Sequence, residues 1–288
     1  MGVGTMSRVR EISVETVTAT VRDLFVAANC ELNQDMENAL ARAAEEEVSP
    51  LGRYALAKIL ENINVARQDK LPLCQDTGLA VVFVEMGQDV HMVGGDFSEA
   101  VQEGVRQAYR EGYLRKSLCD PLSRKNTGDN TPAVIFTELV PGDRLKLIAM
   151  PKGGGSENMS SSAMLVPAVG EAGIVDHVVA CVQKAGSNPC PPVVLGVGIG
   201  GSLEMSALLA KKALLRQIGT ANDRDERLAA MEREILEKIN RLGIGPQGYG
   251  GRVTALAVFV EMMPCHIASL PVTVNIQCHV ARHREAVI

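Results

Sequence analysis

Three of the seven cysteines lie where a thiol is poorly explained as filling of an apolar core. Cys190 has a proline on each side, Cys74 follows a Pro-Leu pair, and Cys278 ends a β-branched run. Prolines and strand ends hold a side chain rigidly, and a rigid thiolate is a good ligand for a metal. These three cysteines are therefore candidate metal ligands.

The other four cysteines fit a metal site less well. Cys30 and Cys181 fall in apolar helical patterns and are expected to be inert, Cys119 fits either role, and Cys265 is the main rival to Cys278. No two cysteines form a CxxC pair, which argues against a zinc ribbon or finger. Three distant cysteines can instead hold a four-iron cluster and leave one iron open, as a Lewis acid, to a substrate hydroxyl.

Glycine and proline gather in three further loops, at residues 152–156, 196–202 and 243–251. Such loops let the backbone turn sharply or let a ligand come close. The middle loop formally satisfies G-x-G-x-x-G between a strand and a helix, but no strand precedes Asp223, where the acidic partner of a nicotinamide site would lie. The first loop lacks the spacing of a phosphate-binding loop. Both are expected to shape a site of another kind.

Histidines near the C-terminal end invite a zinc or haem interpretation. They are His266, His279 and His283. Taken singly, a histidine more often makes structural hydrogen bonds, and we expect this for the last two.

The composition excludes several classes of partner. A net charge of −5 gives no electrostatic reason to bind nucleic acid or an anionic membrane. No apolar run approaches the roughly 20 residues needed to cross a bilayer, and Met1–Arg10 lacks the apolar core of a signal peptide. We therefore expect a cytoplasmic protein whose thiols stay reduced.

The hydrophobic pattern predicts helices first and an alternation of strands and helices afterwards. Helical spacing covers residues 11–66, with a break at Ser49-Pro50. Strands are predicted at 79–85, 133–139, 145–150, 192–197, 253–260 and 271–276, and helices at 98–115, 171–185, 203–217 and 223–242. The expected fold is α/β (mixed α+β), a single domain over 1–288 with a helical N-terminal region (about 11–66) packed on a mixed-sheet core (about 67–288). The Gly/Pro-rich loops are expected to form the active site.

The motifs occur in a specific order along the chain. They are Leu73-Cys74-Gln75-Asp76-Thr77-Gly78, Lys125-Asn126-Thr127-Gly128-Asp129-Asn130-Thr131-Pro132, Pro151-Lys152-Gly153-Gly154-Gly155-Ser156-Glu157-Asn158, Cys190-Pro191-Pro192, Ile199-Gly200-Gly201-Ser202 and Leu242-Gly243-Ile244-Gly245-Pro246-Gln247. With the tail from His266 to Cys278, this order resembles the α subunit of two-subunit class I (iron–sulfur) fumarate hydratases and L-tartrate dehydratases. The resemblance covers about residues 12–288.

The resemblance implies a cofactor and its ligands. Cys74, Cys190 and Cys278 match the three ligands of a 4Fe–4S cluster with one substrate-accessible iron. Cys265 matches no ligand position.

The same resemblance implies the residues around the substrate. Gln75 and Asp76 match residues that line the substrate site, Arg115 matches an arginine that binds a substrate carboxylate, and Gly155 matches a glycine whose backbone faces the substrate. His266 matches a histidine near the active site that acts across a subunit interface, so Asp76 and His266 are the candidate catalytic residues.

The implied activity is reversible hydration of a C4 dicarboxylate, with fumarate and (S)-malate as the first expectation and L-tartrate dehydration to oxaloacetate as the alternative. The chain ends at Ile288, shortly after the third cysteine. We therefore expect a separate β subunit to supply the general base, in an α2β2 hetero-oligomer. A non-catalytic iron–sulfur assembly or sensing module is the alternative from another class.

Overall fold

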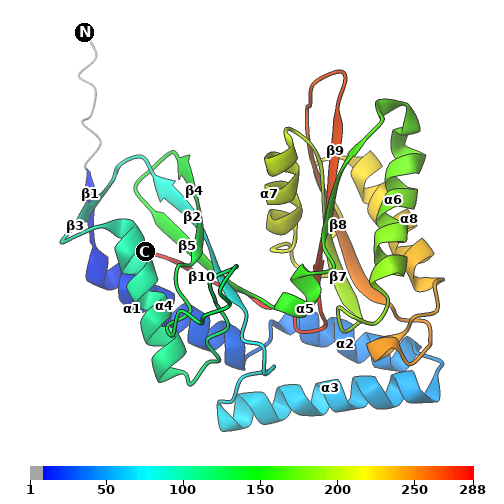
Figure 1. Ribbon diagram of the computed structural model, residues 1–288, viewed down its shortest axis with the longest axis horizontal. Coiled ribbons are helices and arrows are strands. Elements are labelled where there is room, and N and C mark those ends of the chain that lie inside the picture. Colours follow the sequence, from blue (N-terminus) through cyan, green and yellow to red (C-terminus); the bar gives the residue numbers. More distant parts are fainter. Residues whose placement is uncertain (1–8) are drawn as a thin grey trace. The chain divides into compact units, whose positions relative to one another are not determined.

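The computed structural model describes residues 9–288 and contains two compact units (Figure 1). Unit 1 comprises the described part of Met1–Glu31 together with Ala66–Lys152 and Arg282–Ile288, and unit 2 comprises Leu32–Val65 and Gly153–Ala281. The expectation about a signal peptide falls largely on residues 1–8, outside the described residues. Among the described helices, none is long and apolar enough to cross a membrane.

Unit 1 is a four-stranded mixed sheet covered by two helices. Its strand order is β10 (Arg284–Val287), β5 (Leu145–Lys152), β2 (Leu79–Gly87) and β4 (Val134–Val140). The central strand β2 is parallel to β4 and antiparallel to β5. The apolar stripes of α1 (Val14–Cys30) and α4 (Phe97–Glu111) share one core with β2 and β5. A small parallel pair, β1 (Arg10–Ser13) and β3 (Val90–Val93), completes the unit.

Unit 2 is a second four-stranded mixed sheet, with helices on both faces. Its strand order is β6 (Ser161–Leu165), β9 (Leu270–Gln277), β7 (Val193–Gly200) and β8 (Ala255–Met263). Its helices are α2 (Gln34–Glu46), most of α3 (Pro50–Asp69), α5 (Gly154–Glu157), α6 (Gly170–Ala185), α7 (Leu203–Ala213) and α8 (Glu226–Asn240). Two single turns of 3₁₀ helix, η1 (Pro167–Val169) and η2 (Pro246–Gly248), lie in its loops.

Alternation along β7 sends its two faces to different helices. Its odd-numbered residues, all Val, Leu or Ile, join the core that α6 and α8 cover. On the other face lie Gly196 and Gly198, and an added Cβ there would collide with the backbone of α7 at Ala210 and Ser206. Figure 1 shows α7 on one side of this sheet and α6 and α8 on the other. These two glycines of the G-x-G-x-x-G pattern thus serve helix–strand packing.

The mixed α/β fold class predicted from the sequence is confirmed. Every predicted strand and helix has an observed counterpart, with ends that differ by a few residues. The helical region 11–66 divides between the units: α1 belongs to unit 1, whereas α2 and most of α3 belong to unit 2. The sequence pattern missed the strands β1, β3, β6 and β10, which have only four or five residues each and carry little periodicity.

A buried carboxylate ties the end of α2 to the loop before β8. Glu47 is fully buried, and it accepts backbone N–H groups of Val48 and Ser49 on its own turn and of Arg252 and Val253 across the unit. Burial raises the pKa of Glu47, but these four N–H donors outweigh it and hold the pKa below its usual range. The charged carboxylate therefore stabilises the native state.

Replacing this carboxylate by Glu47→Gln turns one acceptor oxygen into an NH₂ group that faces backbone donors. We expect the free energy of unfolding at pH 7 to fall by about 1.5–3 kcal/mol, the range for hydrogen bonds to charged groups. A depressed native pKa stabilises above the unfolded-state pKa of about 4.3 and loses that contribution as pH falls further. Urea unfolding of both proteins should therefore show the difference shrinking below that pH.

The matched control is Glu46→Gln, because Glu46 is exposed on the same helix end. It should cost little at any pH. An equal deficit of Glu47→Gln at pH 3 and pH 7 would contradict the role of the charge.

Candidate active site

Two of the candidate ligands meet at one edge of the unit 2 sheet. Cys190 lies just before β7, and Cys278 lies just after β9. The two strands are antiparallel, with Val194 opposite Gln277, so the start of one meets the end of the other. The backbone N–H of His279 donates to the Cys190 carbonyl over 3.4 Å. Strand pairing thus brings together two cysteine segments that are nearly ninety residues apart in the sequence.

The turn that carries Cys190 is fixed by its main chain. Cys190 has φ +55°, a conformation uncommon for a residue with a side chain. Its N–H donates to the Ser187 carbonyl over 3.0 Å, and its own carbonyl lies 3.0 Å from His279 Nδ1. The side chain of Cys190 is exposed. The backbone of Cys190 is thus fixed by hydrogen bonds, while the residue itself is exposed.

The candidate substrate glycine lies at the same edge. Gly155 is in the short helix α5, and an added Cβ would lie 3.7 Å from the Asn188 carbonyl, two residues before Cys190. The Ser156 hydroxyl donates to Gln277 Oε1 over 3.4 Å, beside Cys278. The structure therefore brings Gly155 near the segments that carry Cys190 and Cys278.

Helix α5 is also anchored by charge. Glu157 at its end pairs with Lys211 of α7, and Asn275 of β9 donates to the same carboxylate over 3.2 Å. Two buried atoms of β9, Asn275 Oδ1 and Gln277 Nε2, have no hydrogen-bond partner among the described residues. Unpaired buried polar atoms are costly, so their presence beside Cys278 marks a place that a ligand or water would complete.

The remaining candidates belong to unit 1. Asp76 Oδ1 accepts the Gly78 N–H over 3.0 Å, its carbonyl accepts Arg282 Nη2 over 2.7 Å, and the Thr77 hydroxyl donates to the Arg115 carbonyl over 2.8 Å. These contacts bring the Cys74-Gln75-Asp76 turn beside Arg115. Gln75 and the Arg115 residue are exposed, and Cys74 is partly buried.

A buried tyrosine holds this turn through hydrogen bonds to its backbone. The hydroxyl of Tyr109 lies 2.7 Å from the Thr77 carbonyl and 2.8 Å from the Gly78 carbonyl. Burial, the largest cause, raises the pKa of Tyr109 well above its usual value, so the hydroxyl stays protonated as a donor. Gly78 itself has φ +83°, and a Cβ there would press on the backbone of Lys152, so glycine is required.

His266 is placed apart from the other unit 2 candidates. It follows β8, whose last residue Met263 pairs with Gly200 at the far end of β7 from Cys190. The strand between spans roughly 23 Å at about 3.3 Å per residue. His266 is exposed, and its Nδ1 accepts the Ala268 N–H over 3.2 Å.

Cys265 lies on the same distant loop, where its thiol donates to the Ser269 carbonyl over 3.1 Å. Within one copy of unit 2, Cys265 therefore cannot share a centre with Cys190, whereas Cys278 lies beside it. Within unit 2, this placement favours Cys278 over Cys265 as the partner of Cys190.

Neither unit by itself gathers three His, Cys, Asp or Glu side chains into a metal site among residues 9–288. Cys74 belongs to unit 1, and Cys190 and Cys278 belong to unit 2. A centre that uses all three thiolates therefore needs both units and is part of the proposal below.

The sequence indicated no functional role for two residues beside Cys190. They are Gln247 and His279, and the latter makes the structural hydrogen bonds that were expected of it. Gln247 in η2 donates through Nε2 to the Pro191 carbonyl over 2.7 Å, and the same nitrogen lies 3.1 Å from His279 Nδ1. The position of Gln247 in a glycine-rich loop and of His279 directly after Cys278 were the available signals. A cavity of about 470 Å³ in unit 2, lined by α3 and by Gln247, Tyr249 and His279, opens beside them.

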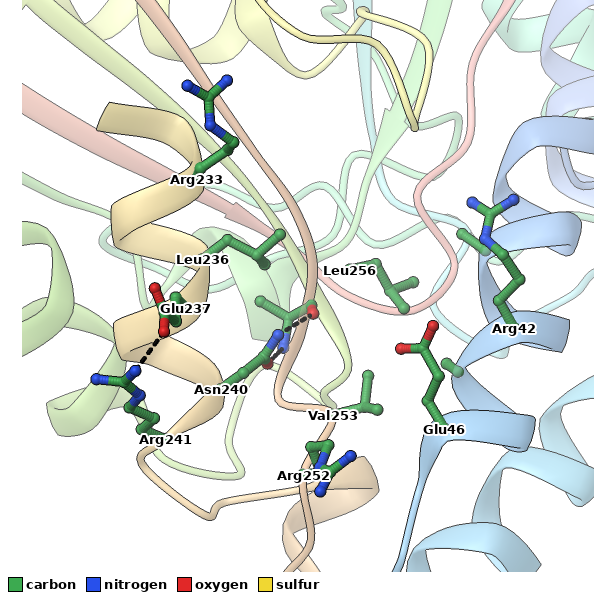
Figure 2. A pocket seen from close by; sticks show the side chains of 13 residues that line it. Arg42, Glu46, Arg233, Leu236, Glu237, Asn240, Arg241, Arg252, Val253 and Leu256 are labelled. Atoms are coloured by element: carbon green, nitrogen blue, oxygen red, sulfur yellow. Dashed lines mark hydrogen bonds and ion pairs between the residues drawn. The ribbon is translucent and has the colours of Figure 1, made fainter. Parts of the chain in front are cut away.

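A larger cavity of unit 2, of about 590 Å³, is lined by α2, α8 and the start of β8 and contains none of the candidate residues (Figure 2). The side chain of Asn240 bridges this seam, because Nδ2 donates to the Ala255 carbonyl over 3.1 Å and Oδ1 accepts two backbone N–H groups. Arg241 pairs with Glu237 on α8, as the dashed line shows. The Asn240 contacts join helix to strand, whereas the Arg241–Glu237 pair lies within the end of α8; both serve the fold.

Comparison with known proteins identifies the family of the chain. The sequence profile described as Fumarate hydratase (Fumerase) matches residues 18–287. The chain belongs to the fumarate hydratase family.

Named relatives narrow the class. The chain is 44% identical over 268 residues to a protein of Methanocaldococcus jannaschii whose name assigns it provisionally as an L(+)-tartrate dehydratase subunit alpha, covering 91% of this chain and 94% of that protein. It is 30% identical over 273 residues to the L(+)-tartrate dehydratase subunit alpha of Escherichia coli strain UTI89, covering 93% and 89%. Together with the family match, these relatives identify a hydro-lyase α subunit.

The cysteines away from the site differ in environment. Burial raises the pKa of the Cys30 and Cys181 thiols, which disfavours the thiolate needed to bind metal or react. The Cys30 thiol donates to the Lys70 carbonyl over 3.7 Å, and Cys181 lies 3.6 Å from His177 Nε2.

Alkylation of the folded chain should reflect this difference. At neutral pH, iodoacetamide should label exposed Cys265 several-fold faster than buried Cys30, as read by mass spectrometry of the labelled peptides. Because the raised pKa shifts formation of the Cys30 thiolate to higher pH, raising the pH should reduce the ratio of the Cys265 labelling rate to the Cys30 labelling rate. Equal labelling of both cysteines in the folded chain at neutral pH would contradict the assignment.

Proposed function

We propose that this chain is the α subunit of an iron–sulfur hydro-lyase that dehydrates L-tartrate to oxaloacetate. The observation that carries the proposal is the near full-length similarity to two proteins named as L(+)-tartrate dehydratase α subunits. The sequence motifs led us to expect fumarate first, and the names of these relatives favour the alternative, L-tartrate, instead. Hydration of fumarate to (S)-malate remains the second candidate, because the family profile carries that description.

The chemistry of the residues present supports a 4Fe–4S cluster held by Cys74, Cys190 and Cys278. No disulfide engages a cysteine among residues 9–288, and each of these three thiols is at least partly accessible. The unpartnered donor Gln277 Nε2 beside Cys278 suits a sulfur acceptor, and such donors tune iron–sulfur centres. Thiolate ligands stay reduced in a reducing compartment, so we propose that the protein works in the cytoplasm.

The reaction removes a hydroxyl from one carbon of L-tartrate and a proton from its neighbour. Water leaves, and the enol that remains becomes oxaloacetate by moving one proton from oxygen to carbon. When bound, the cluster supplies a Lewis-acidic iron toward the substrate hydroxyl.

The chain's own residues bind and orient the diacid. The exposed guanidinium of Arg115 pairs with a carboxylate through its planar fork, which fixes direction as well as charge. Gly155 leaves room for substrate because it has no side chain, and the Gln75 amide donates to a substrate oxygen. Asp76, held through Oδ1 by the Gly78 N–H, accepts from a substrate hydroxyl.

Two contributions come from other chains. A β subunit supplies the base that takes the carbon-bound proton, in an assembly of two α and two β subunits. His266, at the far end of the unit 2 sheet from Cys190, acts in the site of a neighbouring subunit.

A substrate screen separates the two activities. We expect the chain, co-purified with its β partner and reconstituted with iron and sulfide without oxygen, to convert L-tartrate with a higher kcat/KM than (S)-malate or fumarate. A site built to hydrogen-bond the extra hydroxyl rejects the diacid that lacks it. Oxaloacetate formed from L-tartrate is measured by coupled reduction, and formation or loss of fumarate is measured by its ultraviolet absorbance. Preference for fumarate would transfer the assignment to the second candidate, and activity on neither would overturn the proposal.

Cysteine substitutions test the ligand set. Cys74→Ser, Cys190→Ser and Cys278→Ser should each lose most cluster iron and the activity, because a neutral hydroxyl is a poor iron ligand. Cys265→Ser is the matched control and should keep both, since that thiol bonds Ser269 at the other end of the sheet. Iron and sulfide analysis measures the outcome. Loss of the cluster in the control, with retention in Cys278→Ser, would reverse the assignment.

Arg115→Ala tests carboxylate binding. Loss of two charged hydrogen bonds should lower kcat/KM on the order of a hundred- to ten-thousandfold, mainly through KM. Arg115→Lys keeps the charge without the fork and should recover part of this. Arg124→Ala, an exposed arginine of the same loop region, is the control. Unchanged steady-state kinetics in Arg115→Ala would remove Arg115 from the site.

A further inference from the structure

Gln247 holds the turn that follows Cys190 with both its backbone and its side chain. Its N–H and its Nε2 each donate to the Pro191 carbonyl, and each distance is 2.7 Å. Gln247 has φ +54°, in the left-handed region, which a residue with a side chain adopts only when its surroundings require it. In this conformation, the Gln247 side chain reaches both the turn after Cys190 and the ring of His279.

His279 makes further contacts with the turn that carries Cys190. Its backbone N–H donates to the Cys190 carbonyl over 3.4 Å, and its Nδ1 lies 3.0 Å from that carbonyl and 3.1 Å from Gln247 Nε2. With a proton on Nδ1, the ring is a second donor to the Cys190 carbonyl. Gln247 Nε2 then donates to the Pro191 carbonyl and packs against the ring without donating to it. Because Cys278 is the preceding residue, these bonds connect the two cysteine segments through their main chains.

The loop that carries Gln247 is itself fixed. A side chain at Gly248 would collide with Ser187, so this loop packs directly on the turn before Cys190. A few residues further on, the buried carboxylate of Glu47 holds the N–H groups of Arg252 and Val253. Gln247 is thus presented from a rigid support.

We propose that Gln247 and His279 are positioning residues that fix the spacing of Cys190 and Cys278 for the cluster. The inference rests on the proposed function, because it assumes that these thiolates bind iron. Two ligands held at the correct spacing before binding lose less conformational freedom when the cluster forms. Removal of outer contacts at metal sites typically lowers metal affinity about 10- to 100-fold.

The test uses the full chain with its β partner, reconstituted anaerobically with iron and sulfide. The variants are Gln247→Glu, which keeps the shape but loses the donors, and His279→Ala. We expect each variant to lose its cluster to a chelator roughly ten- to a hundredfold faster than wild type. The loss is measured as the decrease of the cluster's visible absorbance with time. The melting temperature of the cluster-free chains should stay near that of wild type, which separates positioning from misfolding.

A pair of substitutions at His279 tests the geometry itself. Asparagine places an amide nitrogen near the position of Nδ1, whereas glutamine places it near Nε2. His279→Asn should therefore retain the cluster better than His279→Gln. Tyr249→Phe, on the rim of the neighbouring cavity, should match wild type.

The outcomes distinguish this inference from the function. If wild type takes up no cluster, the proposed function fails. If wild type holds a cluster and Gln247→Glu, His279→Ala and His279→Gln hold it equally well, the positioning role fails while the function stands. Cluster loss equal in His279→Asn and His279→Gln would also overturn the role assigned to Nδ1.

Discussion

Antiparallel pairing of β7 and β9 is the constraint on which the placement of Cys190 and Cys278 depends. It sets Val194 opposite Gln277 and thereby places the turn before β7 beside the residues after β9. Hydrogen bonds between strands are cooperative along a ladder, so the register that aligns six residue pairs also aligns the two cysteine segments beyond it. A slip of one residue would turn Gln277 to the other face and move Cys278 away from Cys190. The site is therefore as well defined as the sheet that supports it.

Around Cys190 and Cys278, loops held by hydrogen bonds and close packing lie beside a buried polar atom that has no hydrogen-bond partner among the described residues. Glu47 and the glycine contacts around Gly248 fix the loops, whereas Gln277 Nε2 is left without a partner in the described part of the chain. Proteins accept such a cost mainly at places of function. In unit 1, the buried Tyr109 supports the turn of Asp76 and Cys74 in a similar way. Each unit contributes a rigid turn that carries thiol and polar groups outward.

Sequence reasoning found what local chemistry reveals. Prolines on both sides of Cys190 and the strand end before Cys278 indicated rigid thiols, and long periodic segments such as α6 were predicted within a residue of their ends. It could not find the partners of β7, because periodicity records which face is buried and not which strand lies alongside. For the same reason it gave no role to Gln247, whose contacts with Pro191 exist only after two distant loops meet. The assignment of the substrate likewise followed from comparison with relatives and not from any single residue.

The central claim is that three thiolates bind a four-iron cluster in which one iron remains open to substrate. Mössbauer spectroscopy of the α/β complex reconstituted with ⁵⁷Fe tests it most directly, because the method resolves individual iron sites. The account predicts four irons per chain, one of which changes its signal when L-tartrate is added while the other three do not. Absence of bound iron, or a spectrum that L-tartrate leaves unchanged at every site, would contradict it.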